Sequence, residues 1–290
     1  VNSLQAIGIA GHMHGATLLG KNGEILHPCI LWNDTRSYKQ ASILDKDVNL
    51  REITGNIVFP GFTAPKLLWI QNNKPELFDQ VAKVLLPASY LGYYLTGEFF
   101  MDMSDAAGTS WLDVGNRCWS EYALKAGNMR SDQMPKLLEG SQVASSVSKF
   151  IADELGIPSG VAVVAGAGDN AAAACGVGIT KEGQGFVSIG TSGVLLTARD
   201  TYTPLANSAV HTFCHAIPKT WYQMGVILSA TDSLNWLSSV TGKSPIELSA
   251  GLNHKINGPS PEKFYPYLSG ERTPLNDAHI SCLLYTSDAA

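Results

Sequence analysis

The stretch Val161–Gly178, VAVVAGAGDNAAAACGVG, constrains the fold of this chain most strongly. Its first part, Val161–Ala165, is short, apolar and rich in β-branched residues, which is typical of a buried strand. Its later part, Ala171–Cys175, consists of small residues that favour a helix. Two glycines and the carboxylate of Asp169 stand between the two parts. A strand, a glycine turn and a helix place Asp169 beside the N–H groups of a helix N-terminus.

Two interpretations of Asp169 follow from this turn. The simpler one is that Asp169 caps the helix. The other is that Asp169 faces a ligand, and the glycines favour it because they let another molecule approach the backbone closely. The pattern Gly166-x-Gly168-x-x-Ala171 also resembles a dinucleotide-binding fingerprint, and hence an oxidoreductase. A carboxylate at that place would repel the pyrophosphate, which argues against this alternative.

Length and composition exclude several classes of protein. The chain has 290 residues, of which 45% are hydrophobic and 16% charged, enough for one large domain or two. The net charge of −5, without a basic stripe, argues against nucleic acid as a partner. No apolar run is long enough to span a membrane, and the first residues do not resemble a signal peptide. We therefore expect a cytoplasmic protein, with its five cysteines as small buried residues of a reducing compartment.

Both ends of the sequence indicate a fragment of a longer protein. The first residue is Val1, and a strand is expected almost at once, over Leu4–Ala10. Residues 281–290 do not continue the pattern before them and resemble a translated vector tail. We exclude this tail from the expected fold.

A polar cluster follows the first expected strand. His12, Met13 and His14 stand between glycines at its end, and a hairpin with an Asn-Gly turn at Asn22–Gly23 comes next. A polar, glycine-flanked cluster at a strand end is typical of a ligand site, although Met13 and His14 fit a packing role equally well. No carboxylate or cysteine completes a metal site with the two histidines, so no metal is expected.

A second polar group follows the hairpin. Trp32, Asn33, Asp34 and Arg36 together can form a polyol site, in which the indole covers a carbon skeleton and the polar groups hold hydroxyls. The alternative is that Asp34 caps a helix and pairs with Arg36. The two interpretations are compatible.

The pattern changes near Lys181–Gln184, where we expect a domain boundary. Two β-rich runs then meet at a Gly-Thr-Ser-Gly turn, residues 190–193, which offers consecutive N–H groups and two hydroxyls. Such a turn suits a phosphate group, although ordinary hairpins use the same residues. His211 and His215 share one face of a later strand. Without further ligands nearby, we expect them to be structural or close to the substrate rather than bound to zinc.

Asp169, the polar cluster and the glycine-rich turn together indicate phosphoryl transfer to a hydroxyl group. That reaction requires positioning, charge neutralisation and a group that accepts the hydroxyl proton. Asp169 can be that base, which contributes on the order of 10²–10⁴ in rate. The amides of the turn can hold the transferring phosphoryl group. A non-catalytic sugar-binding protein is the alternative, in which Asp169 and the turn have no chemical role.

Several motifs, in their order along the chain, resemble the FGGY family of carbohydrate kinases. The stretch Gly61–Asn73, with Lys66 and Trp69 at the expected spacing, resembles a signature of that family. The motifs at residues 10–15, 31–36, 104–109, 168–170, 188–193 and 266–274 extend the resemblance. Together they span about Leu4–His279.

The resemblance implies a mixed α/β, ribonuclease-H-like fold, as in the actin, hexokinase and sugar kinase ATPases, with two domains and a cleft between them. Residues 1–182 would form the N-terminal domain without its first strands, and residues 183–280 the start of the C-terminal domain. The resemblance further implies ATP and Mg²⁺ as cofactors and a small-molecule sugar, most simply D-xylulose, that is phosphorylated at its terminal hydroxyl. It is compatible with a homodimer.

The resemblance also implies roles for individual residues. Asp169 would be the general base that deprotonates the sugar. The residues that contact the sugar would be Met13, His14, Trp32 and Asn170. The residues that bind phosphate of ATP would be Gly190, Thr191 and Ser192.

Some features of the family are missing from this sequence. The first phosphate loop, with its metal-linked aspartate, would precede Val1, and the adenosine-binding glycine motif would follow Ile280. We therefore expect the chain alone to have little kinase activity. His12 stands where glutamine is usual. Kinases of the same family that act on ribulose, gluconate or glycerol are the nearest alternatives, and Met13 with His14 favours a neutral ketopentose.

Overall fold

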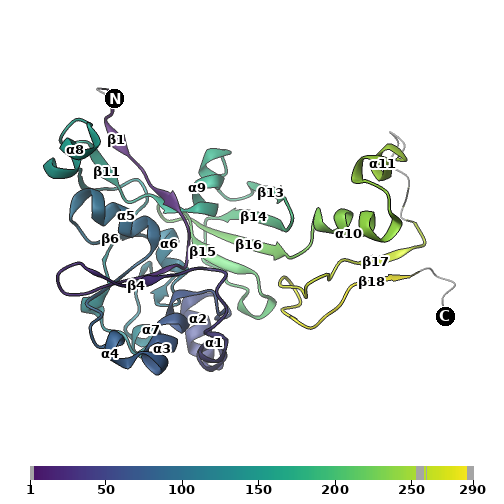
Figure 1. The fold of residues 1–290 in the computed structure, drawn as a ribbon, viewed down its shortest axis with the longest axis horizontal. Coiled ribbons are helices and arrows are strands. Elements are labelled where there is room, and N and C mark those ends of the chain that lie inside the picture. The colour runs from purple at the N-terminus through teal and green to yellow at the C-terminus, as the bar shows by residue number, and fades with distance from the viewer. Residues whose placement is uncertain (1–2, 253–257, 259, 286–290) are drawn as a thin grey trace. The chain divides into compact units, whose positions relative to one another are not determined.

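The computed structural model describes residues 3–252, 258 and 260–285, and consists of short strands and helices in mixed order along the chain (Figure 1). Val1 and the last part of the expected vector tail, residues 286–290, lie outside the described residues. The strands are β1 (Ala6–Ile7), β2 (Ala10–Gly11), β3 (Ala16–Leu19), β4 (Ile25–Ile30), β5 (Lys83–Leu85), β6 (Phe100–Asp102), β7 (Leu112–Asp113), β8 (Cys118–Trp119), β9 (Lys136–Leu138), β10 (Val143–Ser146), β11 (Ala162–Val164), β12 (Ala167–Gly168), β13 (Gly185–Ile189), β14 (Gly193–Arg199), β15 (His211–Cys214), β16 (Trp221–Ile227), β17 (Lys263–Tyr265) and β18 (Leu283–Tyr285). The α-helices are α1 (Tyr38–Leu44), α2 (Val48–Thr54), α3 (Thr63–Asn73), α4 (Pro75–Phe78), α5 (Pro87–Thr96), α6 (Met103–Ala107), α7 (Glu121–Ala126), α8 (Lys149–Leu155), α9 (Asp169–Gly176), α10 (Asp232–Thr241) and α11 (Pro245–Ala250), and the 3₁₀-helices are η1 (Ser131–Gln133) and η2 (Ala206–Ser208).

The chain forms two compact units, which we describe separately. Unit 1 comprises residues 1–184, 197–206 and 211–223, and unit 2 comprises residues 185–196, 207–210 and 224–290. Strands β14 and β16 contribute residues to both units, within a sheet of order β13-β14-β16-β15.

Parallel pairing in unit 1 brings the start of the chain beside the strand that precedes Asp169. β1 pairs in parallel with β11, and β10 pairs antiparallel with the other edge of β11. β2 pairs in parallel with β12, so that Gly11 lies opposite Gly168. Because parallel strands end at the same edge of a sheet, the residues that follow these two glycines emerge side by side.

The strand expected over Leu4–Ala10 is interrupted, and so is the neighbouring segment, which is divided into β11 and β12. Gly8 and Ile9 separate β1 from β2. Opposite this break, Gly166 has a φ of 85°, and a Cβ atom there would lie 2.0 Å from the Ile9 carbonyl oxygen. The chain therefore bends where two backbones approach each other closely, and only glycine fits the position.

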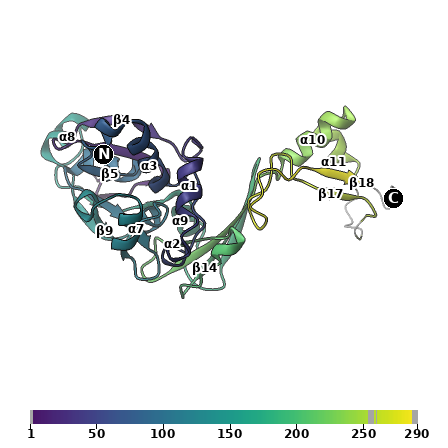
Figure 2. The same ribbon diagram turned by 90° about the horizontal axis from the view of Figure 1, so that it is seen from below.

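Among the described residues of unit 1, we distinguish two hydrophobic cores. The first lies around the sheet of order β4-β3-β5 and includes Leu18, Leu67 and Trp111. Helices α1 and α3 both contribute to this core and pack against each other (Figures 1 and 2). The second core lies between β11, α5 and α8, and includes Val163 and Ile151. The expected Asn-Gly hairpin between β3 and β4 is confirmed, with Gly23 at a φ of 80°.

Most of the motif at residues 104–109 belongs to helix α6, which spans Met103–Ala107. The Asp102 side chain caps α6 by accepting hydrogen bonds from the N–H groups of Ser104 and Asp105, at 2.8 and 3.0 Å. This cap satisfies N–H groups that would otherwise lack partners at the helix start, and it makes a helix of one turn stable in the core.

All five cysteines are free, in line with the absence of a CxxC pair. The expectation that they are buried is right only for Cys214 and is wrong for the others. Cys118 is exposed because it lies on β8, one strand of an isolated two-stranded hairpin.

Unit 2 contains the Gly-Thr-Ser-Gly turn between β13 and β14, and helices α10 and α11. α10 begins at Asp232. The segment 264–274 begins with part of β17, and the Phe264 ring stacks on Trp236 at 5.2 Å. No helix within the described ranges of either unit has the length and apolar character needed to span a membrane.

We expect Gly166→Ala to lower the free energy of unfolding by about 3 kcal/mol, because the left-handed φ and the contact with the Ile9 carbonyl both oppose a side chain. Gly97→Ala is a matched control, since Gly97 has a φ of 79° and a Cβ atom there would meet nothing within 4 Å. The control should lose only about 1 kcal/mol. Urea unfolding measures both losses, and equal losses would contradict the close approach.

Candidate functional site

The structure brings the polar cluster at residues 12–14 beside Asp169. β2 ends at Gly11 and β12 ends at Gly168, and these two glycines are paired. His12 and Asp169 are the next residue on each chain, at the same edge. The sequence-predicted residues Met13, His14, Asp169 and Asn170 therefore come from two adjacent parallel strand ends, the usual place for a ligand in an α/β fold.

Asp169 is the first residue of α9, and its carboxylate is exposed to solvent. The capping interpretation is wrong in that the N-cap position is occupied by Gly168. The Oδ1 atom of Asp169 accepts hydrogen bonds from the backbone N–H and the Nδ2 of Asn170, at 2.8 and 3.1 Å. Asn170 therefore fixes the orientation of the carboxylate.

Met13 lies beneath the strand ends and is only 5% exposed. Its side chain packs on Gly168, where a Cβ atom would come within 2.9 Å of Met13 Cγ. The Tyr222 hydroxyl lies 3.9 Å from the Met13 sulfur. These contacts correspond to the packing role that the sequence left open for Met13.

His14 adopts a left-handed backbone conformation with a φ of 67°. Its Nδ1 lies 2.7 Å from the carbonyl oxygen of Gly108. Because a carbonyl only accepts, Nδ1 carries the hydrogen of this bond. The ring stacks on Phe62 at 4.6 Å with an interplanar angle of 16°. Gly108 is needed here, since a Cβ atom would lie 2.5 Å from the imidazole.

Two side chains of α3 hold the backbone of His14. The His14 carbonyl oxygen accepts hydrogen bonds from Lys66 Nζ at 2.8 Å and from Thr63 Oγ1 at 3.2 Å. Lys66 is 0% exposed. Burial lowers the pKa of Lys66 to about 8, against the opposing influence of Cys29 and Asp34. Sequence reasoning assigned Lys66 no role, although a single lysine among apolar helix residues was a visible signal.

A cluster of aromatic rings adjoins His14. Phe62 lies 6.1 Å from Phe213, and Phe213 stacks on His211 at 5.2 Å with an interplanar angle of 13°. Phe59 lies 5.2 Å from His211. His211 is thus buried among the rings that border His14, as expected for a histidine that is structural or close to the substrate. In the described parts of the chain, no three His, Cys, Asp or Glu side chains are grouped as metal ligands.

His12 is the neighbour of Asp169 across the paired strand ends. Within the described residues nothing forms a hydrogen bond with its buried Nε2 atom. Burial, and next the charge of Lys66, lower the pKa of His12, whereas Asp169 opposes this shift. His12 is therefore a neutral imidazole at pH 7.

A polar network under the strand ends was missed by sequence reasoning. The hydroxyl of Ser104 accepts a hydrogen bond from the N–H of Gly168 at 2.9 Å and donates to Asp102. It thereby connects α6 to the residue that precedes Asp169. Asp105 is 0% exposed, and neither of its carboxyl oxygens has a hydrogen-bond partner among the described residues. Burial, then Asp102 and Asp169, raise the pKa of Asp105 well above its ordinary value.

The structure does not bring Trp32 into contact with His14 or Asp169. The Trp32 side chain is exposed, and no hydrogen bond or ring contact between described residues joins it to His14 or Asp169. The expected pairing of Asp34 with Arg36 is confirmed, with Arg36 Nη2 2.6 Å from Asp34 Oδ2. The expected cap is wrong, because α1 begins later and Ser37 holds its N-cap position.

The Gly-Thr-Ser-Gly turn lies in unit 2 and is fastened to the start of α10. The carbonyl oxygens of Gly190 and Thr191 accept hydrogen bonds from the N–H groups of Thr231 and Ala230, at 2.9 and 2.8 Å. The N–H of Gly190 donates to the Ser192 carbonyl at 2.9 Å, so this amide serves the turn itself. Thr191 and Ser192 are exposed.

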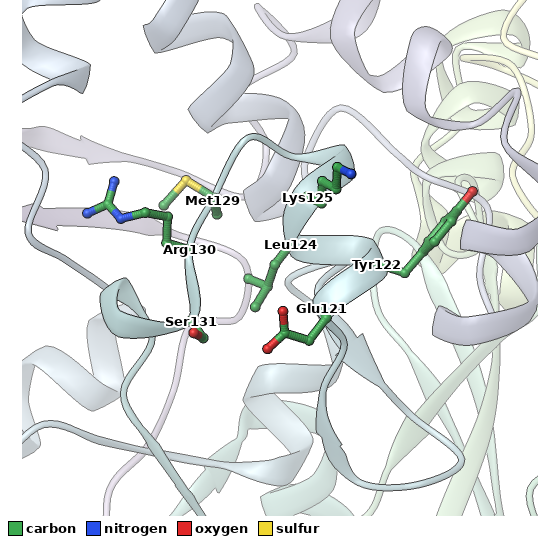
Figure 3. A pocket seen from close by; sticks show the side chains of 7 residues that line it. All are labelled: Glu121, Tyr122, Leu124, Lys125, Met129, Arg130 and Ser131. Carbon is green, nitrogen blue, oxygen red and sulfur yellow. The ribbon is translucent and has the colours of Figure 1, made fainter.

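Unit 1 also contains a hollow of about 520 Å³ that is lined by other residues. The side chains that line it are Glu121, Tyr122, Leu124, Lys125, Met129, Arg130 and Ser131 (Figure 3). None of the candidate site residues is among them. Its two basic residues, Lys125 and Arg130, are exposed, and Arg130 forms an ion pair with Asp132. We therefore keep the paired strand ends as the candidate site.

Comparison with known proteins agrees with the motifs at these strand ends. The profile of the FGGY family of carbohydrate kinases, N-terminal domain, matches residues 1–176. The chain belongs to the FGGY family of carbohydrate kinases. It is 48% identical over 279 residues to a xylulose kinase of Escherichia coli (strain K12), a match that covers 96% of this chain and 57% of the relative.

Solved structures of FGGY kinases share the fold. A structure described as a xyloylose kinase from Brucella ovis matches 99% of this chain and 60% of that chain, with a TM-score of 0.94 and 52% identity. A ligand-bound xylulose kinase from Lactobacillus acidophilus matches 96% and 58% of the two chains, with a TM-score of 0.88 and 25% identity. The expected actin/hexokinase-like α/β fold is thus confirmed. The chain spans less than two thirds of the length of these relatives.

We expect Asp105→Asn to stabilise this FGGY chain at neutral pH. The raised pKa means that the folded chain keeps a proton which the unfolded chain releases above about pH 4. The folded state therefore loses stability as the pH rises above 4. The variant should exceed the wild type by about 1–3 kcal/mol at pH 7.5 and by less at pH 5.

Urea unfolding at the two pH values measures this difference. Asp153→Asn, at an exposed position on α8, is the control and should change stability equally at both. A constant difference for Asp105→Asn would contradict a protonated, buried carboxyl group.

Proposed function

We propose that this chain provides the sugar-binding part of an ATP-dependent kinase that converts D-xylulose to D-xylulose 5-phosphate. The pairing of β2 with β12 is the observation that carries the proposal, because it joins His14 and Asp169 at one edge. The similarity to xylulose kinases at 48% and 52% identity supports the choice of sugar. Membership of the FGGY family favours a kinase over the oxidoreductase and the non-catalytic sugar-binding protein.

Asp169 acts as the general base in this proposal. Its Oδ1 is held by Asn170. Oδ2 receives no hydrogen bond from the residues that the structure describes, and we assign to it the proton of the attacking sugar hydroxyl. The carboxylate lies in the first turn of α9 and is exposed to solvent, so an incoming alcohol can reach it.

The other predicted residues position the two substrates. His14 contacts the sugar, Met13 forms the floor under the strand ends, and Asn170 orients the base. Trp32 remains a proposed sugar contact that relies on the family resemblance alone. Gly190, Thr191 and Ser192 bind phosphate of ATP, supported by the anchoring of their turn to α10.

Mg²⁺ accompanies ATP in this proposal. Magnesium prefers oxygen ligands and in kinase sites is bound through one or two carboxylates together with the phosphate oxygens of the substrate. The exposed hydroxyl groups of Thr191 and Ser192 fit this preference. When bound, the ion would neutralise charge on the transferring phosphoryl group.

We further propose that residues 1–182 form the N-terminal FGGY kinase domain and residues 183–280 the start of the C-terminal one. Residues 281–290 are proposed to be a non-native tail, of which Leu283–Tyr285 form β18 and pair with β17. A cytoplasmic location and a homodimer complete the proposal, and rest on the composition and the family resemblance.

Asp169→Asn should lower kcat by about 10²–10⁴, with a smaller change in KM, because only the transfer of the proton is lost. A coupled ADP-release assay measures this in a chain extended to the length of the relatives. Asp153→Asn is the control and should retain kcat. Unchanged turnover in Asp169→Asn would contradict the assignment of the base.

D-xylulose should have the highest kcat/KM in a panel with D-ribulose, gluconate and glycerol. A neutral sugar places no charge next to the Asp169 carboxylate, whereas gluconate would be repelled. The ranking of D-xylulose above D-ribulose and glycerol rests on the similarity to xylulose kinases. The same assay on the extended chain measures the ratios. A preference for gluconate or glycerol would replace xylulose with that substrate and leave the kinase assignment in place.

A further inference from the structure

We propose that Lys66 is a positioning residue of the sugar site, whose buried side chain holds the His14 carbonyl and keeps the imidazole turned toward the sugar. The placement of the sugar at His14 and its identity, a neutral ketopentose, rest on the proposed function. The contact between Lys66 and His14 is observed directly at 2.8 Å.

The conformation of His14 calls for such support. A φ of 67° lies in the left-handed region, which is uncommon and less favourable for a residue with a side chain. The ring side is held by the Gly108 carbonyl and by the Phe62 ring. The backbone side is held at the carbonyl oxygen, so the residue is fixed at both ends.

Both donors to this carbonyl come from one face of α3. Thr63 and Lys66 are three residues apart and therefore neighbours on the helix surface. They converge on the same oxygen, at 3.2 and 2.8 Å. The ammonium group is charged, and a charged donor makes the stronger hydrogen bond of the two.

Stability alone does not account for a lysine at this place. Lys66 is fully buried, and no carboxylate between residues 3 and 252 lies within ion-pair distance of its Nζ. A buried charge without an ionic partner is costly to the folded state. An apolar residue of similar size would suit the core better, so the benefit lies in what the ammonium group holds.

The change in charge of Lys66 can be followed separately from the titration of the groups that face it. These are Cys29 on β4, Asp34 after β4 and His12 after β2. Burial raises the pKa of Cys29, and the hydrogen bond from Arg36 lowers that of Asp34. Burial also lowers the pKa of His12. Between pH 7 and 9, Lys66, with its pKa of about 8, is therefore the member of this group that changes charge.

The first test follows the His14 imidazole by NMR in this chain from pH 7 to 9, with the signal assigned by its loss in His14→Gln. We expect a step in its chemical shift near pH 8 as Lys66 loses its proton. Lys66→Arg should abolish the step, because a guanidinium keeps its charge. Lys74→Met, at an exposed lysine after the same helix, should retain it. The absence of a step in the wild type, or its persistence in Lys66→Arg, overturns the proposal.

The second test measures D-xylulose affinity by calorimetry. Lys66→Met should bind D-xylulose about 10-fold more weakly at pH 7. The reason is that His14 loses the hydrogen bond that supports its left-handed backbone conformation. Lys66→Arg should recover part of this loss, and Lys74→Met should match the wild type. Wild-type affinity should fall between pH 7 and 9, and that of Lys66→Met should stay constant.

The two tests separate the proposals. Equal affinity of Lys66→Met and wild type overturns the role of Lys66 in the sugar site. If the wild type fails to bind D-xylulose, the proposed substrate is wrong, and the NMR step still decides whether Lys66 positions His14.

Discussion

The pairing of β2 with β12 is the contact on which the site depends. Each strand contributes only two residues, and Gly11 lies opposite Gly168. This short ladder joins segments that are far apart in the sequence and sets the base, Asp169, beside His12–His14. The close approach of Gly166 to the Ile9 carbonyl allows it, since any larger residue would separate the two chains.

Residues outside the strand ends then fix the orientation of the groups at the site. The Ser104 hydroxyl holds the N–H of Gly168 from below, and Asn170 holds Asp169 from its own helix. Lys66 and Thr63 hold the His14 backbone from α3. Ser104, Lys66 and Thr63 are buried, so each has one geometry, and the site is built before a ligand arrives.

Sequence reasoning identified the parts of the site that local pattern controls. A β-branched run, a glycine turn and small residues were enough to place Asp169 at the start of a helix, and the glycine-flanked His12–His14 at a strand end. It failed where a segment far away in the sequence determines the local structure or the role of a residue. The break between β1 and β2 depends on Gly166, and the role of Lys66 depends on a carbonyl 52 positions away. Asp102, as the cap of α6, showed no pattern that separates a turn from a one-turn helix.

A crystal structure of this chain with D-xylulose bound tests the central claim most directly. We predict that the sugar lies at the carboxyl ends of β2 and β12, within hydrogen-bond distance of both His14 and Asp169. A sugar bound elsewhere in unit 1, such as the hollow beside Glu121 and Ser131, would contradict it, as would one that contacts only one of the two strand ends.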